Sequence, residues 1–192
     1  MTRRRAAAAA AAVIAAAGMA AVAHATSVPD RDDVTVGIDI AKVSGTHNRA
    51  TDELVQTVDA YQPFKPADML NKDKPPSSIC IEIWTTNKPG EKQANYEACA
   101  TPDAQGKDWQ ASLARARLKG PRLRVGPVKV EQPSATRLVM RIDPDAIRRP
   151  ASYRWRAETT WFGTGCKDAS GCQDYAPDRP ETAVTKLSTP RH

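Results

Sequence analysis

The stretch from residue 78 to residue 100 limits the possible folds of this chain most strongly. Residues 79–84 alternate isoleucine with a cysteine, a glutamate and a tryptophan, which is the period-two pattern of a strand with one buried face. Residues 87–90 read Asn-Lys-Pro-Gly and favour a turn. A second short run with its own cysteine follows at residues 94–100. This stretch therefore predicts a β-hairpin.

A bridge between Cys80 and Cys99 would fix the register of that hairpin. In an antiparallel pair, the numbers of opposite residues have a constant sum, so the bridge determines every other pair. The pairs that follow are Ile81 with Ala98, Ile83 with Tyr96, and Glu82 with Glu97. The isoleucines, Tyr96 and the alanines then share one apolar face, so the register set by the bridge agrees with the register set by hydrophobicity.

The same register places Glu82 directly opposite Glu97, where like charges are destabilising. One interpretation is a cation site or an acid/base pair, although opposed side chains sit too close for an inverting pair of carboxylates. The other is that neighbouring arginines shield the two glutamates on an exposed sheet face, and we favour it. The candidate arginines are Arg115, Arg117, Arg154 and Arg156.

Residues 1–25 predict an export signal. Three arginines precede an alanine-rich apolar segment, and Ala-His-Ala at its end fits the small-x-small rule for cleavage after Ala25. An uncut membrane anchor is the weaker alternative, because the segment is short and mostly alanine. We therefore expect a secreted, extracellular chain without a transmembrane segment once the signal is removed.

Charge and cysteine usage agree with export. The signal segment holds three of the 28 basic residues, leaving 25 against 22 acidic ones without a long basic block, so nucleic acid is not an expected partner. All four cysteines follow the signal segment, as suits an oxidising compartment. Of three possible connectivities, Cys80–Cys99 with Cys166–Cys172 is the simplest. A zinc site lacks a Cys-x-x-Cys pair, and neither metal nor cofactor is predicted.

The remaining pattern predicts an all-β, antiparallel β-sandwich with short helical turns and two local disulfides. A loop is expected at 45–52 and a sheet-edge bulge at Gly126-Pro127. Asp143 is expected to cap a helical turn that begins at Pro144. Including the hairpin, about eight strands are expected, the others at 34–40, 54–61, 110–118, 122–131, 136–142 and 153–161. The predicted organisation is a leader at 26–31, one domain at 32–179 and a disordered tail at 180–192.

The end of the chain resembles a known group of domains. Tyr-Arg-Trp-Arg-Ala at 153–157, the Cys166-x5-Cys172 spacing and Asp-Tyr-Ala-Pro-Asp at 174–178 resemble the closing segment of exported bacterial β-sandwiches. These belong to the group that contains DOMON domains and family-nine carbohydrate-binding modules. The resemblance implies a sandwich that binds sugar, or haem, or no ligand. No haem ligand pair is recognisable here, since a loop is expected to hold His47.

A sugar site needs exposed aromatic rings, because the C–H face of a sugar is apolar. The candidates are Trp84, on the outward side of the hairpin, and Trp109, at the start of a strand. The alternative for Trp84, which we favour, is that it covers the adjacent disulfide.

A group of aspartates also has two interpretations. Asp174 and Asp178 could converge with other carboxylates on calcium, which prefers oxygen ligands. The other carboxylates are Asp30, Asp32 and Asp33. Alternatively Asp174 caps a turn and Pro177 ends the last element. We favour the cap, because no Asp-x-Asp-x-Asp-Gly motif is present.

Enzyme motifs do not appear in this sequence. It has no Gly-x-Ser-x-Gly elbow, phosphate-binding glycine loop or His-Glu-x-x-His, and paired cysteines supply no nucleophile. We expect a secreted, non-catalytic binding or surface-interaction module whose first candidate ligand is a carbohydrate or cell-wall polymer. The candidate binding residues are Trp84, Trp109, Glu82 and Glu97. The alternative is a structural or protein-interaction domain, with another extracellular protein as partner; a carboxylate-dependent hydrolase comes last.

Overall fold

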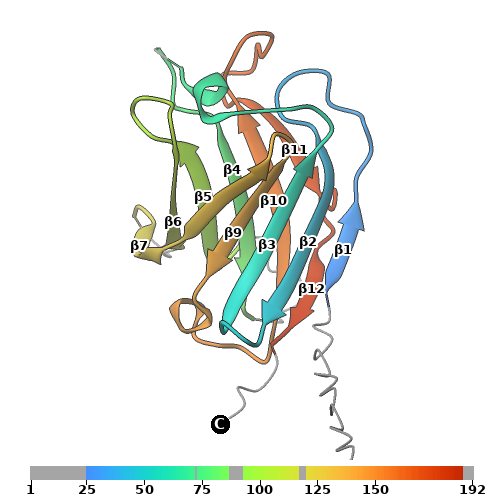
Figure 1. Ribbon diagram of the computed structural model, residues 1–192, viewed down its shortest axis with the longest axis vertical. Helices are drawn as coiled ribbons and strands as arrows, with labels where there is room; N and C mark the ends of the chain where they lie inside the picture. The colour runs from blue at the N-terminus through green and yellow to red at the C-terminus, as the bar shows by residue number, and fades with distance from the viewer. Residues whose placement is uncertain (1–24, 72, 87–92, 117–119, 188–192) are drawn as a thin grey trace, which may run out of the picture.

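The computed structural model describes residues 25–71, 73–86, 93–116 and 120–187. In this part of the chain, twelve strands form two antiparallel sheets that pack face to face (Figure 1). This confirms the predicted all-β antiparallel sandwich. The predicted signal segment at 1–24 lies outside the described residues.

The first sheet has five strands in the order β1, β2, β3, β9, β8. Their bounds are β1 (Thr26–Pro29), β2 (Ile40–Asn48), β3 (Glu53–Ala60), β9 (Arg137–Ile142) and β8 (Lys129–Ser134). The second sheet has the order β11, β10, β4, β5, β6, β7, with β12 also paired to β10. Their bounds are β11 (Cys172–Ala176), β10 (Ser152–Trp161), β4 (Ser78–Trp84), β5 (Tyr96–Pro102), β6 (Trp109–Arg115), β7 (Leu123–Pro127) and β12 (Ala183–Lys186).

The core lies between the sheets and follows the alternation of each strand. The three isoleucines of β4 are fully buried, as predicted, and so are Tyr153 and Trp155 of β10. Apolar side chains of the first sheet meet them, among them Leu54, Val58, Leu138 and Met140. Two short 3-10 turns, η1 (Pro66–Met69) and η2 (Pro144–Ile147), close loops at the ends of the sandwich. Asp143 caps η2 by accepting a hydrogen bond from the Asp145 N–H, as predicted.

The central hairpin has the predicted register. Cys80 lies opposite Cys99 and Glu82 opposite Glu97, and the other two predicted pairs are also present. Both predicted disulfides are formed, Cys80–Cys99 and Cys166–Cys172. All four cysteines are thereby used, which excludes the zinc alternative for them.

The predicted strand at 34–40 is wrong. The strand begins at Ile40 and runs through most of the predicted loop to Asn48. The pattern was misleading because two inward positions of β2 hold Gly45 and His47 instead of aliphatic residues. Gly45 is needed there because a Cβ atom would lie 2.8 Å from the Trp155 ring. His47 is 3% exposed, and its Nε2 lies 2.9 Å from Asp52.

The segment 122–131 is two strands and not one. β7 pairs with β6 in the second sheet, whereas β8 pairs with β9 in the first. β7 is the edge strand of its sheet, and its pairing with β6 slips by one residue beside Gly126, since Leu113 pairs with Gly126 while Ala114 pairs with Arg124. The predicted edge bulge is therefore present, with Val125 as its extra residue, and the chain crosses to the other sheet directly after Pro127.

Two further strands lie outside the bounds 32–179 predicted for the domain. β1 occupies the predicted leader and pairs with β2, and β12 lies within the predicted disordered tail and pairs with β10. Both segments are short and polar, so neither has a strong hydrophobic alternation. Residues 188–192 of the predicted tail lie outside the described residues.

Candidate functional site

The outer face of the second sheet gathers three glutamates. Glu82 on β4, Glu97 on β5 and Glu158 on β10 all point away from the core, since the residues beside them in sequence are buried. One carboxylate oxygen from each lies within 4.8 Å of the other two. The close approach of Glu82 and Glu97 was predicted. The third glutamate comes from β10, the other neighbour of β4, where Glu158 lies opposite Cys80, two residues from Glu82.

Arginines neutralise two of these glutamates. Arg156 is 5% exposed, and its Nε donates a hydrogen bond of 2.9 Å to Glu82 Oε2, which a second guanidinium N–H also contacts. Glu97 forms an ion pair with Arg122. Shielding by arginine was the favoured expectation, and Arg156 confirms it. Arg122 was not among the predicted arginines, and Arg117 lies outside the described residues.

Glu158 is stabilised differently. Its Oε1 accepts hydrogen bonds from Thr160 Oγ1 at 3.2 Å and from Gln173 Nε2 at 2.9 Å. Burial, followed by the charge of Glu82, raises the pKa of Glu158. This part of the face therefore holds a carboxyl group that has polar neighbours but no direct arginine partner in the described residues.

Trp84 is not available as a sugar platform, because it is only 2% exposed. The guanidinium groups of Arg154 and Arg156 lie 5.7 and 5.4 Å from its ring centroid. Arg156 also lies 5.0 Å from the ring centroid of Tyr175, and Arg179 covers that ring at 3.9 Å. We name these five side chains the arginine–aromatic stack. The alternation of Tyr-Arg-Trp-Arg at 153–156 indicated that Arg154 and Arg156 share the outer face. It could not indicate the rings that they contact, because Trp84 lies on β4 and Tyr175 on β11.

Trp109 belongs to a different part of the molecule. Its ring is half-buried and packs edge-on against Phe64, with 5.9 Å between ring centroids. Its Nε1–H donates a hydrogen bond of 2.9 Å to Gln132 Oε1. Trp109 thus helps to close one margin of the core, while Trp84 lies on the outer face of the sheet. The two predicted tryptophans do not form one binding surface.

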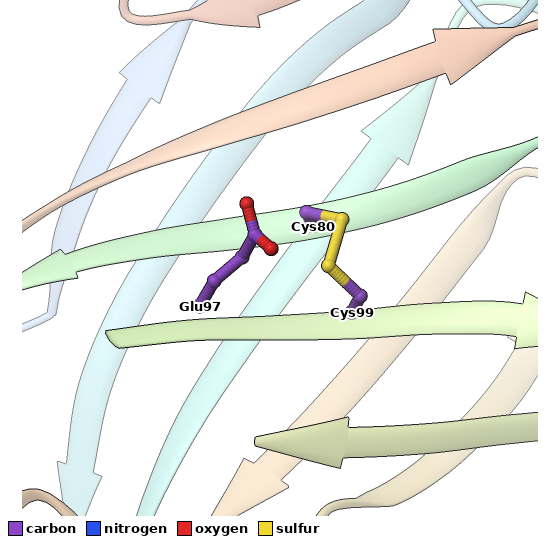
Figure 2. Close-up of side chains that lie close together, drawn as sticks. All are labelled: Cys80, Glu97 and Cys99. Atoms are coloured by element: carbon purple, nitrogen blue, oxygen red, sulfur yellow. A yellow bond between two sulfur atoms is a disulfide. The ribbon is translucent and has the colours of Figure 1, made fainter. Parts of the chain in front are cut away.

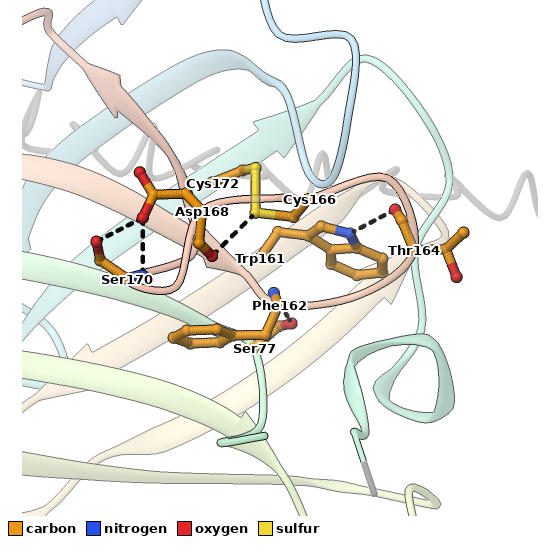
Figure 3. Close-up of a disulfide and its surroundings, with 8 residues drawn as sticks. All are labelled: Ser77, Trp161, Phe162, Thr164, Cys166, Asp168, Ser170 and Cys172. Carbon is orange, nitrogen blue, oxygen red and sulfur yellow. Dashed lines mark hydrogen bonds between the residues drawn. A yellow bond between two sulfur atoms is a disulfide. The ribbon is translucent and has the colours of Figure 1, made fainter. Parts of the chain in front are cut away.

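One disulfide joins the two central strands of this sheet, and the other closes a loop that leads into β11. Figure 2 shows the carboxylate of Glu97 beside the Cys80–Cys99 bridge, on neighbouring positions of β4 and β5. The Cys166–Cys172 bridge closes the loop between β10 and β11 (Figure 3). In that loop Asp168 accepts hydrogen bonds from the backbone and hydroxyl of Ser170. Trp161 Nε1–H donates to the Thr164 carbonyl at 3.3 Å.

A second cluster of acids lies where the segment between β1 and β2 meets β11. Asp174, 5% exposed on β11, accepts hydrogen bonds of 2.7 Å from the backbone N–H groups of Ile40 and Tyr175. The favoured prediction that Asp174 caps a turn is therefore wrong: it lies within a strand and joins the two sheets. Its carboxylate converges with Asp33 and Asp39, with one oxygen of each within 4.8 Å of the others.

Asp39 was missed because it stood near the end of the predicted strand 34–40, where the alternation pointed it outward. The cluster raises the pKa of several members, and burial is the largest cause for each. The pKa of Asp39 rises to about 7, helped by the neighbouring carboxyl groups of Asp32 and Asp174. The pKa of Asp30 rises to about 6, and that of Asp174 is also raised.

Comparison of the chain with protein-family models, curated proteins and solved structures finds no match. No helix in the described residues is long and apolar enough to cross a membrane.

Proposed function

We propose that this chain is an exported, non-catalytic interaction domain that binds another extracellular protein through the outer face of its second sheet. The observation that carries the proposal is the accessible side of the arginine–aromatic stack, where the exposed Arg179 lies over the half-buried ring of Tyr175, beside three half-buried glutamates. Arginine, tyrosine and tryptophan are the residues that protein interfaces favour. Arginines already held against rings lose little further freedom when a partner binds.

The ion pairs on this face support a non-catalytic role. A general acid or base needs a carboxyl group that can exchange its proton with a substrate. Arg156 places two donors on Glu82, and Arg122 is paired with Glu97. Two of the three glutamates are thus bonded to arginines, and Glu158 is bonded to Thr160 and Gln173. This arrangement suits recognition of a charged surface.

A carbohydrate or cell-wall ligand is the second candidate. The sequence supported this candidate through Trp84 and Trp109, whose rings could stack on a sugar. In the structure Trp84 is buried and Trp109 packs against Phe64. Tyr175 remains half-buried on the outer face, but Arg179 covers its ring. A charged partner therefore fits this face better than an apolar sugar surface does.

Export is part of the proposal and has two independent supports. Both disulfides form between the residues predicted to pair, and disulfides persist in oxidising compartments. The arginine-led, alanine-rich start of the chain has the pattern of a cleavable signal.

A variant comparison tests the binding face. The immobilised protein is exposed to the extracellular proteins of the cells that produce it, and retained proteins are quantified by mass spectrometry. Arg179→Ala removes an exposed charge from the stack, while Lys129→Ala removes one from the opposite sheet. We expect at least one protein that wild type and Lys129→Ala retain equally and that Arg179→Ala retains about tenfold less.

Retention that is the same for Arg179→Ala and wild type would contradict the proposed face. Retention of purified cell-wall polysaccharide, with no protein retained, would favour the second candidate.

A further inference from the structure

The aspartate cluster between the two sheets has a buried member without an N–H or hydroxyl donor. Asp39 is 1% exposed, neither of its carboxylate oxygens accepts a hydrogen bond from such a donor in the described residues, and its hydrogen-bonding neighbour is another carboxyl group, that of Asp32. An unpaired buried carboxylate is costly. The negative charges of Asp174, Asp32 and Asp33 raise the pKa of Asp39, so they add to the cost of ionising it. Asp39 therefore points into a site that lacks a positive charge.

The described part of the chain supplies no such charge. None of the acids in this region forms an ion pair with a lysine or arginine in the described residues; the acids are Asp30, Asp32, Asp33, Asp39, Asp174 and Asp178. Asp30 adds a second buried oxygen without a partner, its Oδ2. By contrast, carboxylates elsewhere, such as Asp52 and Asp59, are paired with arginines.

The spacing of the oxygens suits one hard cation. Ca²⁺ binds carboxylate oxygens at about 2.3–2.6 Å, so two ligands on opposite sides of one ion are about 4.6–5.2 Å apart. Oxygens of Asp33, Asp39 and Asp174 lie within 4.8 Å of one another. Asp33 is exposed while the other two are buried, so an ion can reach the buried carboxylates from the solvent side.

The site is also held in place before any ion binds. Asp174 is fixed by the N–H groups of Ile40 and Tyr175. The segment that carries Asp39 is tied to β10, because Thr159 Oγ1 donates a hydrogen bond of 2.8 Å to the Ile38 carbonyl. Gly37, with φ of +101°, lies against Trp161, where a Cβ atom would be 2.7 Å from the Trp161 Cβ.

We propose that Asp33, Asp39 and Asp174 bind a calcium ion, which fastens the segment between β1 and β2 to β11. Three carboxylates carry three negative charges, so a divalent cation removes most of their repulsion, and water completes the coordination. This calcium site does not depend on the proposed protein-binding face.

Calorimetry and thermal unfolding of chelator-treated protein test the proposal. We expect one calcium ion bound per chain and a melting temperature about 5 °C higher or more when calcium exceeds its Kd a hundredfold. Magnesium should raise the melting temperature less, because it requires near-octahedral geometry. Asp33→Asn, at the exposed side, should weaken calcium binding at least about tenfold. Asp68→Asn, a change at an exposed aspartate on η1, should bind as wild type does.

Asp39→Asn gives a result that a purely structural role does not predict. Without calcium it should melt higher than wild type, because it removes a buried unpaired charge, and its melting temperature should no longer respond to calcium. Wild-type protein that neither binds calcium at millimolar concentration nor changes its melting temperature would overturn the proposal. An equal response to magnesium would overturn the assignment to calcium, and unchanged calcium binding by Asp33→Asn would overturn the assigned ligands.

Discussion

Arg156 shows how one residue can connect charge, packing and the proposed binding face. It is nearly fully buried although it lies on the outer side of its sheet, between the rings of Trp84 and Tyr175 and bonded to Glu82. The alternation of β10 predicts that Arg156 points outward, and this is correct. Burial of an outward residue could not be predicted, since it results from rings on β4 and β11 that are distant in sequence.

Replacement of Arg156 should be strongly destabilising. Arg156→Ala leaves the half-buried Glu82 without its partner, and we expect a loss of about 2–4 kcal/mol in the free energy of unfolding. Chemical denaturation measures this loss. Arg141→Ala is the matched control, because Arg141 forms ion pairs with Glu53 and Glu131 on a more exposed surface, where about 1 kcal/mol or less is expected. Equal losses for the two variants would contradict a special role for Arg156.

At the scale of elements, the β2–β3 turn is joined to the segment after η2 by one carboxylate. Asp52 accepts two hydrogen bonds from Arg149, of 3.0 and 2.7 Å, and lies 2.9 Å from His47. Hydrogen bonds from Arg149, then from His47, lower the pKa of Asp52 to about 2. The lowered pKa means that the ionised form stabilises the fold above pH 3.8 and that this contribution disappears as the pH falls towards 2.

Asp52→Asn should therefore destabilise the protein by about 1 kcal/mol at pH 6, a small value because the carboxylate is partly exposed and screened by solvent. Urea unfolding at several pH values should show the two proteins converging in stability between pH 4 and pH 2. Asparagine tolerates the positive φ of 51° at this position, so backbone strain does not obscure the comparison. A difference that stays constant down to pH 2 would contradict the ion pair.

The hairpin of β4 and β5 is the element that the sequence predicted best. Its isoleucine alternation and the bridge across it specify the same register, so local pattern and tertiary structure agree. The double variant Cys80→Ser, Cys99→Ser should lower the free energy of unfolding by about 2–4 kcal/mol, measured against wild type under non-reducing conditions. An unchanged midpoint of unfolding would show that the bridge does not stabilise the fold.

Over the whole molecule, the fold class and both disulfides could be predicted because they depend on alternation and on cysteine spacing. The edges of the sheets could not. β1 and β12 are short and polar. The position of β2 was predicted too early in the chain, because its inward positions include Gly45 and His47. The opposed glutamates were predicted by register alone. The arginine–aromatic stack and the role of Asp39 could not be predicted, because they depend on contacts between segments that are distant in sequence. Hydrophobic periodicity and secondary-structure propensity do not specify such contacts.

The proposed export and the two local disulfides of the sandwich can be tested together. The measurement is mass spectrometry of the protein recovered from the culture medium and digested without reduction. The expected result is an N-terminus at Thr26 with Cys80 joined to Cys99 and Cys166 joined to Cys172. A chain that stays inside the cell with residues 1–25 attached would contradict the proposed export, and any other cysteine pairing would contradict the two disulfides.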